Sequence, residues 1–94
     1  MRIIWRRQAR EDITHVRQYI EQHSPQGARR VVLEIYADMQ RFADAPHLGR
    51  PGRVAGTREA VVPRTPFVVA YSVVGDRLFV LSAMHGARER PSSF

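Results

Sequence analysis

Residues 67–84 read FVVAYSVVGDRLFVLSAM, and this stretch decides the fold class. Its first half, Phe67 to Val74, is almost entirely apolar and rich in β-branched and aromatic residues, which is typical of a central strand covered on much of both faces. Gly75-Asp76 is a two-residue turn of the hairpin type, and Arg77 to Met84 supplies the partner strand. The stretch therefore predicts an antiparallel β-hairpin.

Two further strands are predicted upstream of this hairpin. Ala60-Val61-Val62 is a short apolar run closed by the proline-bounded turn at 63–66, so it completes an antiparallel meander with the hairpin. At the start of the chain, Ile3-Ile4-Trp5 lies between arginines and predicts a first strand. Because the meander is continuous in sequence, the first strand has to join an edge of the sheet.

Two amphipathic helices are predicted between the first strand and the meander. The first covers about Arg7 to His23, and Ser24-Pro25 then marks a new helix start, with Ser24 as N-cap and Pro25 at the first helical position. Pro46 ends the second helix, because the residue before a proline is disfavoured in the helical region. The apolar stripes are Ala9, Ile13, Val16 and Ile20 in the first helix, and Ala28, Val31, Val32, Ile35, Met39 and Phe42 in the second.

The predicted order is β-α-α-β-β-β, an α+β fold of two layers in which an N-terminal helical hairpin packs on an antiparallel sheet. At 94 residues, the chain is expected to form a single domain, 1–94. The connector HLGRPGRVAGTRE, residues 47–59, contains three glycines and Pro51, which argue against any regular element there. Its glycines are expected to provide positive φ angles. The tail from residue 85 onward has no periodicity and is expected to be loose at its end.

The composition excludes several classes of function. The chain has no cysteine, so disulfides, thiol catalysis and Cys-type zinc sites are ruled out, and an intracellular, cytoplasmic location fits. His15 and His23 are too far apart for a compact metal pair, and we expect no metal or other cofactor. No apolar run approaches the roughly 18 residues that span a bilayer.

The charge points to acidic partners. All 15 basic residues are arginine and the net charge is +6, which favours nucleic acid or an acidic protein as partner. A GC-rich genome would also explain the arginine usage. A duplex-DNA-binding role is disfavoured. A recognition helix exposes several polar residues to the bases, whereas the second helix is expected to bury its apolar stripe in the core.

The order of elements resembles the RelE/ParE family of bacterial toxin–antitoxin toxins, from Ile3 to about Arg88. The resemblance rests on PHLGRPG (46–52), GTRE (56–59), PFVVAY (66–71) and MHGAR (84–88). The ParE-like branch is the most similar. It implies a toxin that is neutralised by a small ParD-like antitoxin and that inhibits a cellular target, which for some members is DNA gyrase.

The RelE-like branch implies a different activity, the ribosome-dependent cleavage of messenger RNA without a metal. That reaction needs a base for the ribose 2′-OH, cations for the phosphate and an acid for the leaving oxygen. The resemblance offers Arg58 and His85 for these roles, with Arg53 and Arg88 as phosphate clamps. The chain has no lysine, and no tyrosine or tryptophan follows the last strand to stack on a base. Inhibition by binding is therefore the first hypothesis, with no catalytic residue assigned, and endoribonuclease activity stays the alternative.

Four arginines, Arg50, Arg53, Arg58 and Arg88, are predicted to border an acidic partner. The three arginines in the connector also have a structural interpretation, as a run of solvated surface charges. His85 likewise has one, since it could cap the last strand. Tyr71 lies in mid-strand and is expected in the core with its hydroxyl hydrogen-bonded. The antitoxin is expected to fold on binding into grooves beside the helical hairpin, where Arg10, Arg17 and Arg30 would form the rim.

Overall fold

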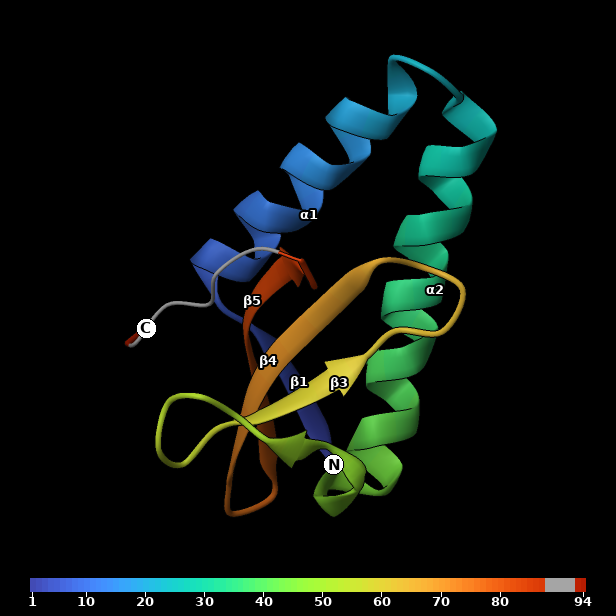
Figure 1. Ribbon diagram of the computed structural model, residues 1–94. Helices are drawn as coiled ribbons and strands as arrows, with labels where there is room; N and C mark the ends of the chain where they lie inside the picture. The colour runs from blue at the N-terminus through green and yellow to red at the C-terminus, as the bar shows by residue number, and fades with distance from the viewer. Residues whose placement is uncertain (88–92) are drawn as a thin grey trace.

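A computed structural model describes residues 1–87 and 93–94 of the chain, and it confirms the α+β architecture. Both helices lie on one side of a single twisted sheet (Figure 1). The elements in chain order are β1 (Arg2–Trp5), α1 (Arg7–Glu21), α2 (Pro25–Asp44), the 3-10 turn η1 (Pro46–Leu48), β2 (Arg50–Pro51), β3 (Arg58–Val61), β4 (Phe67–Val74) and β5 (Arg77–His85).

The helical hairpin forms where the sequence predicts it. The Ser24 hydroxyl accepts a hydrogen bond from the Gly27 N–H at 2.9 Å, and Pro25 is the first residue of α2. This cap satisfies one backbone donor that has no partner inside the helix. The first helix is two residues shorter than predicted and ends at Glu21. The second stripe faces the core, where Ile35 and Met39 are fully buried.

The sheet has the order β1-β5-β4-β3-β2, so β4 is the central strand, as its composition predicts. The meander β3-β4-β5 is antiparallel throughout, and β1 joins an edge, also as predicted. One ladder differs from the expectation of a wholly antiparallel sheet, because β1 runs parallel to β5 and the sheet is mixed. A parallel pair needs a long crossover, and here the whole chain between the two strands provides it.

The connector contains more regular structure than predicted. We expected no element in residues 47–59, but Arg50 and Pro51 form the short edge strand β2, which pairs with Glu59 and Arg58 of β3. The prediction was wrong because proline is tolerated on an edge strand, where its missing N–H can face away from the ladder. β3 also begins two residues earlier than predicted, at Arg58.

One hydrophobic core lies between the sheet and the two helices. Its largest fully buried side chains include Tyr71 from β4, Leu78 from β5 and Ile35 from α2. Trp5 of β1 packs against this cluster and meets Tyr36 edge-on, with ring centroids 4.8 Å apart. In the part of the chain that the structure describes, neither helix is long and apolar enough to cross a membrane.

Candidate functional site

Tyr71 attaches the start of the connector to the centre of the sheet. Its side chain is fully buried and packs on the Phe42 ring of α2, with centroids 5.6 Å apart. The hydroxyl donates to the carbonyl of Pro46 and accepts from the Gly49 N–H at 3.0 Å. The expected position of Tyr71 in the core, with its hydroxyl bonded, is therefore what the structure has.

Burial raises the pKa of the Tyr71 phenol above its ordinary value, because the charged phenolate would lose its hydration. The Gly49 N–H and the positive charge of Arg58 oppose this shift but do not cancel it. Tyr71 is thus held in the neutral form that can donate to a carbonyl. Its role is to position the connector, with no proton transfer required.

The connector glycines serve two different geometric needs. At Gly49 a Cβ atom would lie 2.1 Å from the Tyr71 hydroxyl oxygen, so only glycine admits the close approach of this side chain. Gly56 has a φ of 81°, which is the left-handed conformation expected for it. The prediction that all three connector glycines provide positive φ is correct for Gly56 but wrong for Gly49, whose φ is −65°, and for Gly52, whose φ is not positive either.

Two of the four predicted binding arginines brace the connector. Arg58 donates through Nη1 to the carbonyl oxygens of Gly49 at 2.9 Å and His47 at 3.3 Å. Arg50 forms an ion pair with the buried carboxylate of Glu59, at 3.2 Å between Nη2 and Oε1. Half of the Arg50 side chain is still exposed, so it can contact a partner through its outer edge.

The other two predicted binding arginines are Arg53 and Arg88. Arg53 lies at the outer bend of the connector, is exposed, and makes no hydrogen bond or ion pair among the residues described. Its guanidinium is thus the most available of the connector arginines. Arg88 lies outside the described residues, since these end at 87 and resume at 93.

His85 lies at the end of β5, on the exposed surface. Its Nδ1 atom accepts a hydrogen bond from the Ala87 N–H at 3.1 Å, and its ring meets the Phe67 ring edge-on at 5.8 Å. These contacts close the end of the last strand, as the structural interpretation expects. Its Nε2 atom has no hydrogen bond among the described residues.

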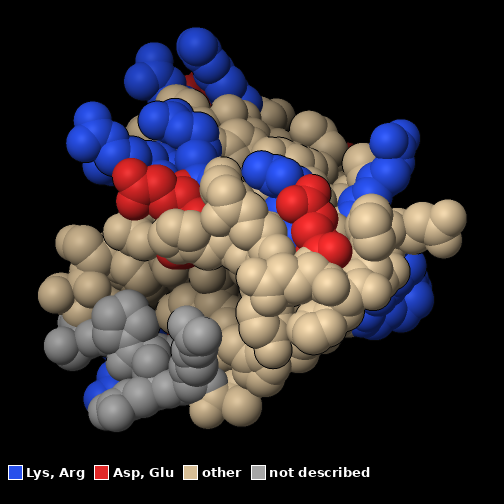
Figure 2. Space-filling model, turned by 90° about the horizontal axis from the view of Figure 1, so that it is seen from above, with Lys and Arg blue, Asp and Glu red and all other residues tan. Residues whose placement is uncertain are grey.

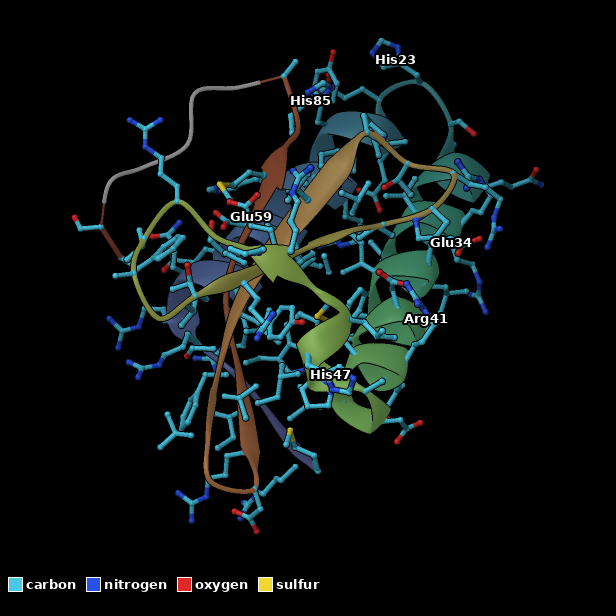
Figure 3. All side chains as sticks on the ribbon, turned by 60° about the horizontal axis from the view of Figure 1, so that its bottom comes forward. His23, Glu34, Arg41, His47, Glu59 and His85 are labelled. Atoms are coloured by element: carbon cyan, nitrogen blue, oxygen red, sulfur yellow. The ribbon has the colours of Figure 1, made fainter. Side chains whose placement is uncertain are left out.

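The fold does not bring Arg58 and His85 together. Arg58 pairs with Tyr71 across one side of β4, whereas His85 pairs with Phe67 across the other. Four residues along a strand and two strand spacings place their Cα atoms roughly 16 Å apart. Figure 3 shows His85 at the opposite end of the molecule from His47, whose carbonyl Arg58 contacts. The Arg58 guanidinium is bound to the connector carbonyls and the His85 ring packs on Phe67, so the two side chains do not converge on one position.

A hollow of about 510 Å³ lies where α1 crosses the end of the sheet. Its lining combines aromatic, aliphatic and histidine side chains with one carboxylate: Asp12, His15, Val16, Tyr19, Phe67, Ala83, Met84 and His85. Tyr19 is two-thirds exposed although it is a large aromatic residue. Seen from the helical-hairpin end, basic side chains gather toward the margins of the molecule and acidic ones lie among them (Figure 2). The hollow thus combines exposed apolar surface with polar side chains.

Asp12 is a site residue that the sequence analysis did not identify. Its Oδ2 atom accepts hydrogen bonds from the Ser82 hydroxyl at 2.8 Å and from the Ala83 N–H at 2.9 Å. β1 ends at Trp5, so the later part of β5 has no strand on that side and Asp12 takes over the Ala83 donor. The only signal in the sequence is a carboxylate at the border of an apolar stripe, beside Ile13.

Comparisons with known proteins agree with this architecture. Residues 3–90 match a family model described as the ParE toxin of the type II toxin–antitoxin system parDE. Toxin Y4kP of Sinorhizobium fredii is 34% identical over 96% of this chain and 93% of its own length. Toxin RelE2 of Caulobacter vibrioides is 31% identical over 92% of this chain and 96% of its own length. A solved structure of the chromosomal ParDE system from P. aeruginosa superposes with a TM-score of 0.81 at 25% identity, covering 90% of this chain and 95% of that one.

Proposed function

This chain belongs to the ParE toxin family of type II toxin–antitoxin systems, and on that premise we propose that it inhibits DNA gyrase by binding to it. It is one toxin domain, 1–94, that acts without covalent chemistry of its own. A ParD-like antitoxin neutralises it. The family membership supports the two-component arrangement, while gyrase is the target that the ParE-like resemblance favours.

The position of Arg58 is the observation that carries this proposal over the nuclease alternative. A nuclease would use this cation on the scissile phosphate, but its guanidinium is already bound to two carbonyl oxygens of the connector. The Cα atom of His85, the proposed acid or base, lies roughly 16 Å from the Cα atom of Arg58 by strand geometry. The remaining arginine surface suits binding to an acidic macromolecule, since charge complementarity steers and orients association.

The antitoxin is proposed to occupy the hollow between α1 and the end of β5. Exposed Tyr19 and half-buried Phe67 offer apolar contacts for an amphipathic segment, in the manner of a helix that binds in a groove. The three arginines expected at the rim are all exposed, but each makes one contact within the chain. Arg10 donates to the Trp5 carbonyl, Arg17 pairs with Glu21, and Arg30 donates to the Arg64 carbonyl.

Cleavage of messenger RNA stays a second candidate because toxin RelE2 of Caulobacter vibrioides is similar over nearly the whole chain. Its name places it with the RelE branch, whose members share this fold. Fold alone does not select between the two activities, so the decision rests with the site. If the chain were a nuclease, Arg58 and His85 would be its catalytic residues, with Arg53 and Arg88 as phosphate clamps.

The proposal is tested with purified DNA gyrase. We expect the toxin to inhibit supercoiling and to trap cleaved DNA on the enzyme, because a binding poison stops the reaction between strand cutting and resealing. A His85→Ala variant serves as a matched control, since His85 has no role in inhibition by binding, and it should inhibit as well as the wild type. If supercoiling continues at every workable toxin concentration, gyrase is not the target.

The antitoxin site is tested by co-expression. A Tyr19→Glu variant should arrest growth like the wild type but escape neutralisation by its co-expressed antitoxin, because a carboxylate replaces an apolar contact. Leu33→Glu on α2, which is 54% exposed and lies outside the hollow, is the control and should still be neutralised. Full neutralisation of the Tyr19 variant would place the antitoxin elsewhere.

A further inference from the structure

Two arginines lie side by side at the edge of the sheet, and no acidic side chain among residues 1–87 and 93–94 pairs with either of them. Arg2 of β1 and Arg77 of β5 are register partners in the parallel ladder, so their Cα atoms are about 4.8 Å apart. Both are exposed, and neither side chain makes an ion pair or hydrogen bond within the described residues. Asp76 lies next to Arg77 in the turn but pairs with neither. Like charges in this position destabilise a sheet unless an anion compensates them.

Strand alternation places this pair on the face of the sheet that the helices do not cover. Ile3 and Leu78 point into the core against the helices, so their neighbours point the other way. On β1 the outward positions are Arg2 and Ile4. On β5 they are Arg77 and Phe79.

Apolar side chains fill the space between the charges on this face. Phe79 and Ile4 are register partners and half-buried, and Val74, the partner of Arg77 on β4, is 63% exposed. The guanidinium of Arg6 lies over the Phe79 ring, 5.2 Å from its centroid. We name this surface the open-face patch, consisting of Arg2, Ile4, Arg6, Val74, Arg77 and Phe79.

We propose that the open-face patch is the surface through which the toxin holds its protein target, and that it binds an acidic, partly apolar surface there. This inference rests on the proposed function, since it assigns the target to one face of the sheet. A partner carboxylate between Arg2 and Arg77 relieves their mutual repulsion, while Val74 and Ile4 lose water to the same contact.

The chemistry of the patch favours a protein over a single-stranded nucleic acid. A base would need a free aromatic face to stack on, and Arg6 already covers the Phe79 ring. The patch is also separate from the hollow assigned to the antitoxin. That hollow is lined by α1 and by the far end of β5 at His85, whereas Arg77 is the first residue of β5.

The test uses Arg77→Glu, because this change converts a like-charged neighbour pair into an opposite-charged one and leaves the fold as stable or more so. The matched control is Arg29→Glu, which makes the same change of charge at an exposed position of α2. Each protein is titrated against gyrase in the supercoiling assay and induced in growing cells. We expect Arg77→Glu to need about tenfold more toxin for half inhibition, and Arg29→Glu to stay within about twofold of the wild type. Val74→Ser should fall between them.

The open-face patch and gyrase as the target can fail independently in these assays. If the wild type arrests growth without inhibiting gyrase, gyrase is wrong, and the growth comparison between Arg77→Glu and Arg29→Glu still decides the patch. Equal potency of Arg77→Glu and the wild type would overturn the patch alone. An equal loss of antitoxin binding by Arg77→Glu, or binding of a single-stranded oligonucleotide that this variant abolishes, would also overturn it. If the wild type neither arrests growth nor inhibits gyrase, both the proposed function and the role of the open-face patch are wrong.

Discussion

Replacing Tyr71 with phenylalanine removes one oxygen atom and two hydrogen bonds that fix the connector to the sheet. The Gly49 N–H is buried and would be left without a partner, which costs about 1–3 kcal/mol, and the Pro46 carbonyl would lose its bond from the hydroxyl as well. We therefore expect Tyr71→Phe to lower the free energy of unfolding by about 2–3 kcal/mol. That is a large part of the roughly 5–14 kcal/mol expected for a domain of this length.

Urea denaturation measures this loss. With an m value of roughly 1–1.5 kcal/mol/M, at the low end for small proteins, the midpoint should fall by about 1.3–3 M. Tyr36→Phe is the matched control, because the Tyr36 hydroxyl makes no hydrogen bond among the described residues and 44% of the side chain is exposed. It should leave the midpoint almost unchanged.

A Tyr71→Phe midpoint within about 0.3 M of the wild type would refute this reasoning. It would mean that the connector is held by other contacts, such as those of Arg58, and that the close approach at Gly49 has no energetic consequence. An equal loss in Tyr36→Phe would refute it as well, because the effect would then come from removing any tyrosine hydroxyl.

Tyr71, Gly49 and Asp12 each allow a further test of the contacts that hold the connector and the last strand. Because the pKa of Tyr71 is raised above 10.0 in the folded state, the stabilisation by its neutral phenol is complete below pH 10 and is lost as the pH rises beyond it. In chemical denaturation at alkaline pH, the free energy of unfolding of Tyr71→Phe should therefore fall less steeply with pH than that of the wild type. Equal slopes for the two proteins would contradict this. Gly49→Ala should destabilise by about 1–3 kcal/mol, since its Cβ would overlap the Tyr71 hydroxyl, and an unchanged melting temperature would show that the connector can move away. Asp12→Ala should cost about 1–3 kcal/mol because it leaves the Ala83 N–H unpaired, whereas Glu11→Ala at an exposed position should be nearly neutral in the same thermal melt.

The sequence predicts those elements whose signals are local. The Ser24 cap, the second apolar stripe and the Gly75 turn each depend on residues within a few positions of one another, and all three appear in the structure. The position of β4 at the centre of the sheet follows in the same way, because a strand buried on both faces must be nearly all apolar.

What the sequence does not predict depends on contacts between distant segments. The parallel pairing of β1 with β5 is decided by which edge is free after the meander has formed. The role of Gly49 is set by Tyr71, 22 residues later, and no local pattern records that approach. For the candidate site, the sequence identifies Arg58 and His85 but cannot show that Arg58 pairs with the middle of β4 on one side and His85 with its first residue on the other.

We propose that this toxin acts by binding and performs no cleavage, and mapping messenger RNA ends on translating ribosomes tests that mode of action most directly. With purified toxin added, we predict the same set of RNA ends as in its absence, for the wild type and for His85→Ala alike. New ends at fixed codon positions that disappear in the His85→Ala variant would contradict the claim and identify the chain as an endoribonuclease.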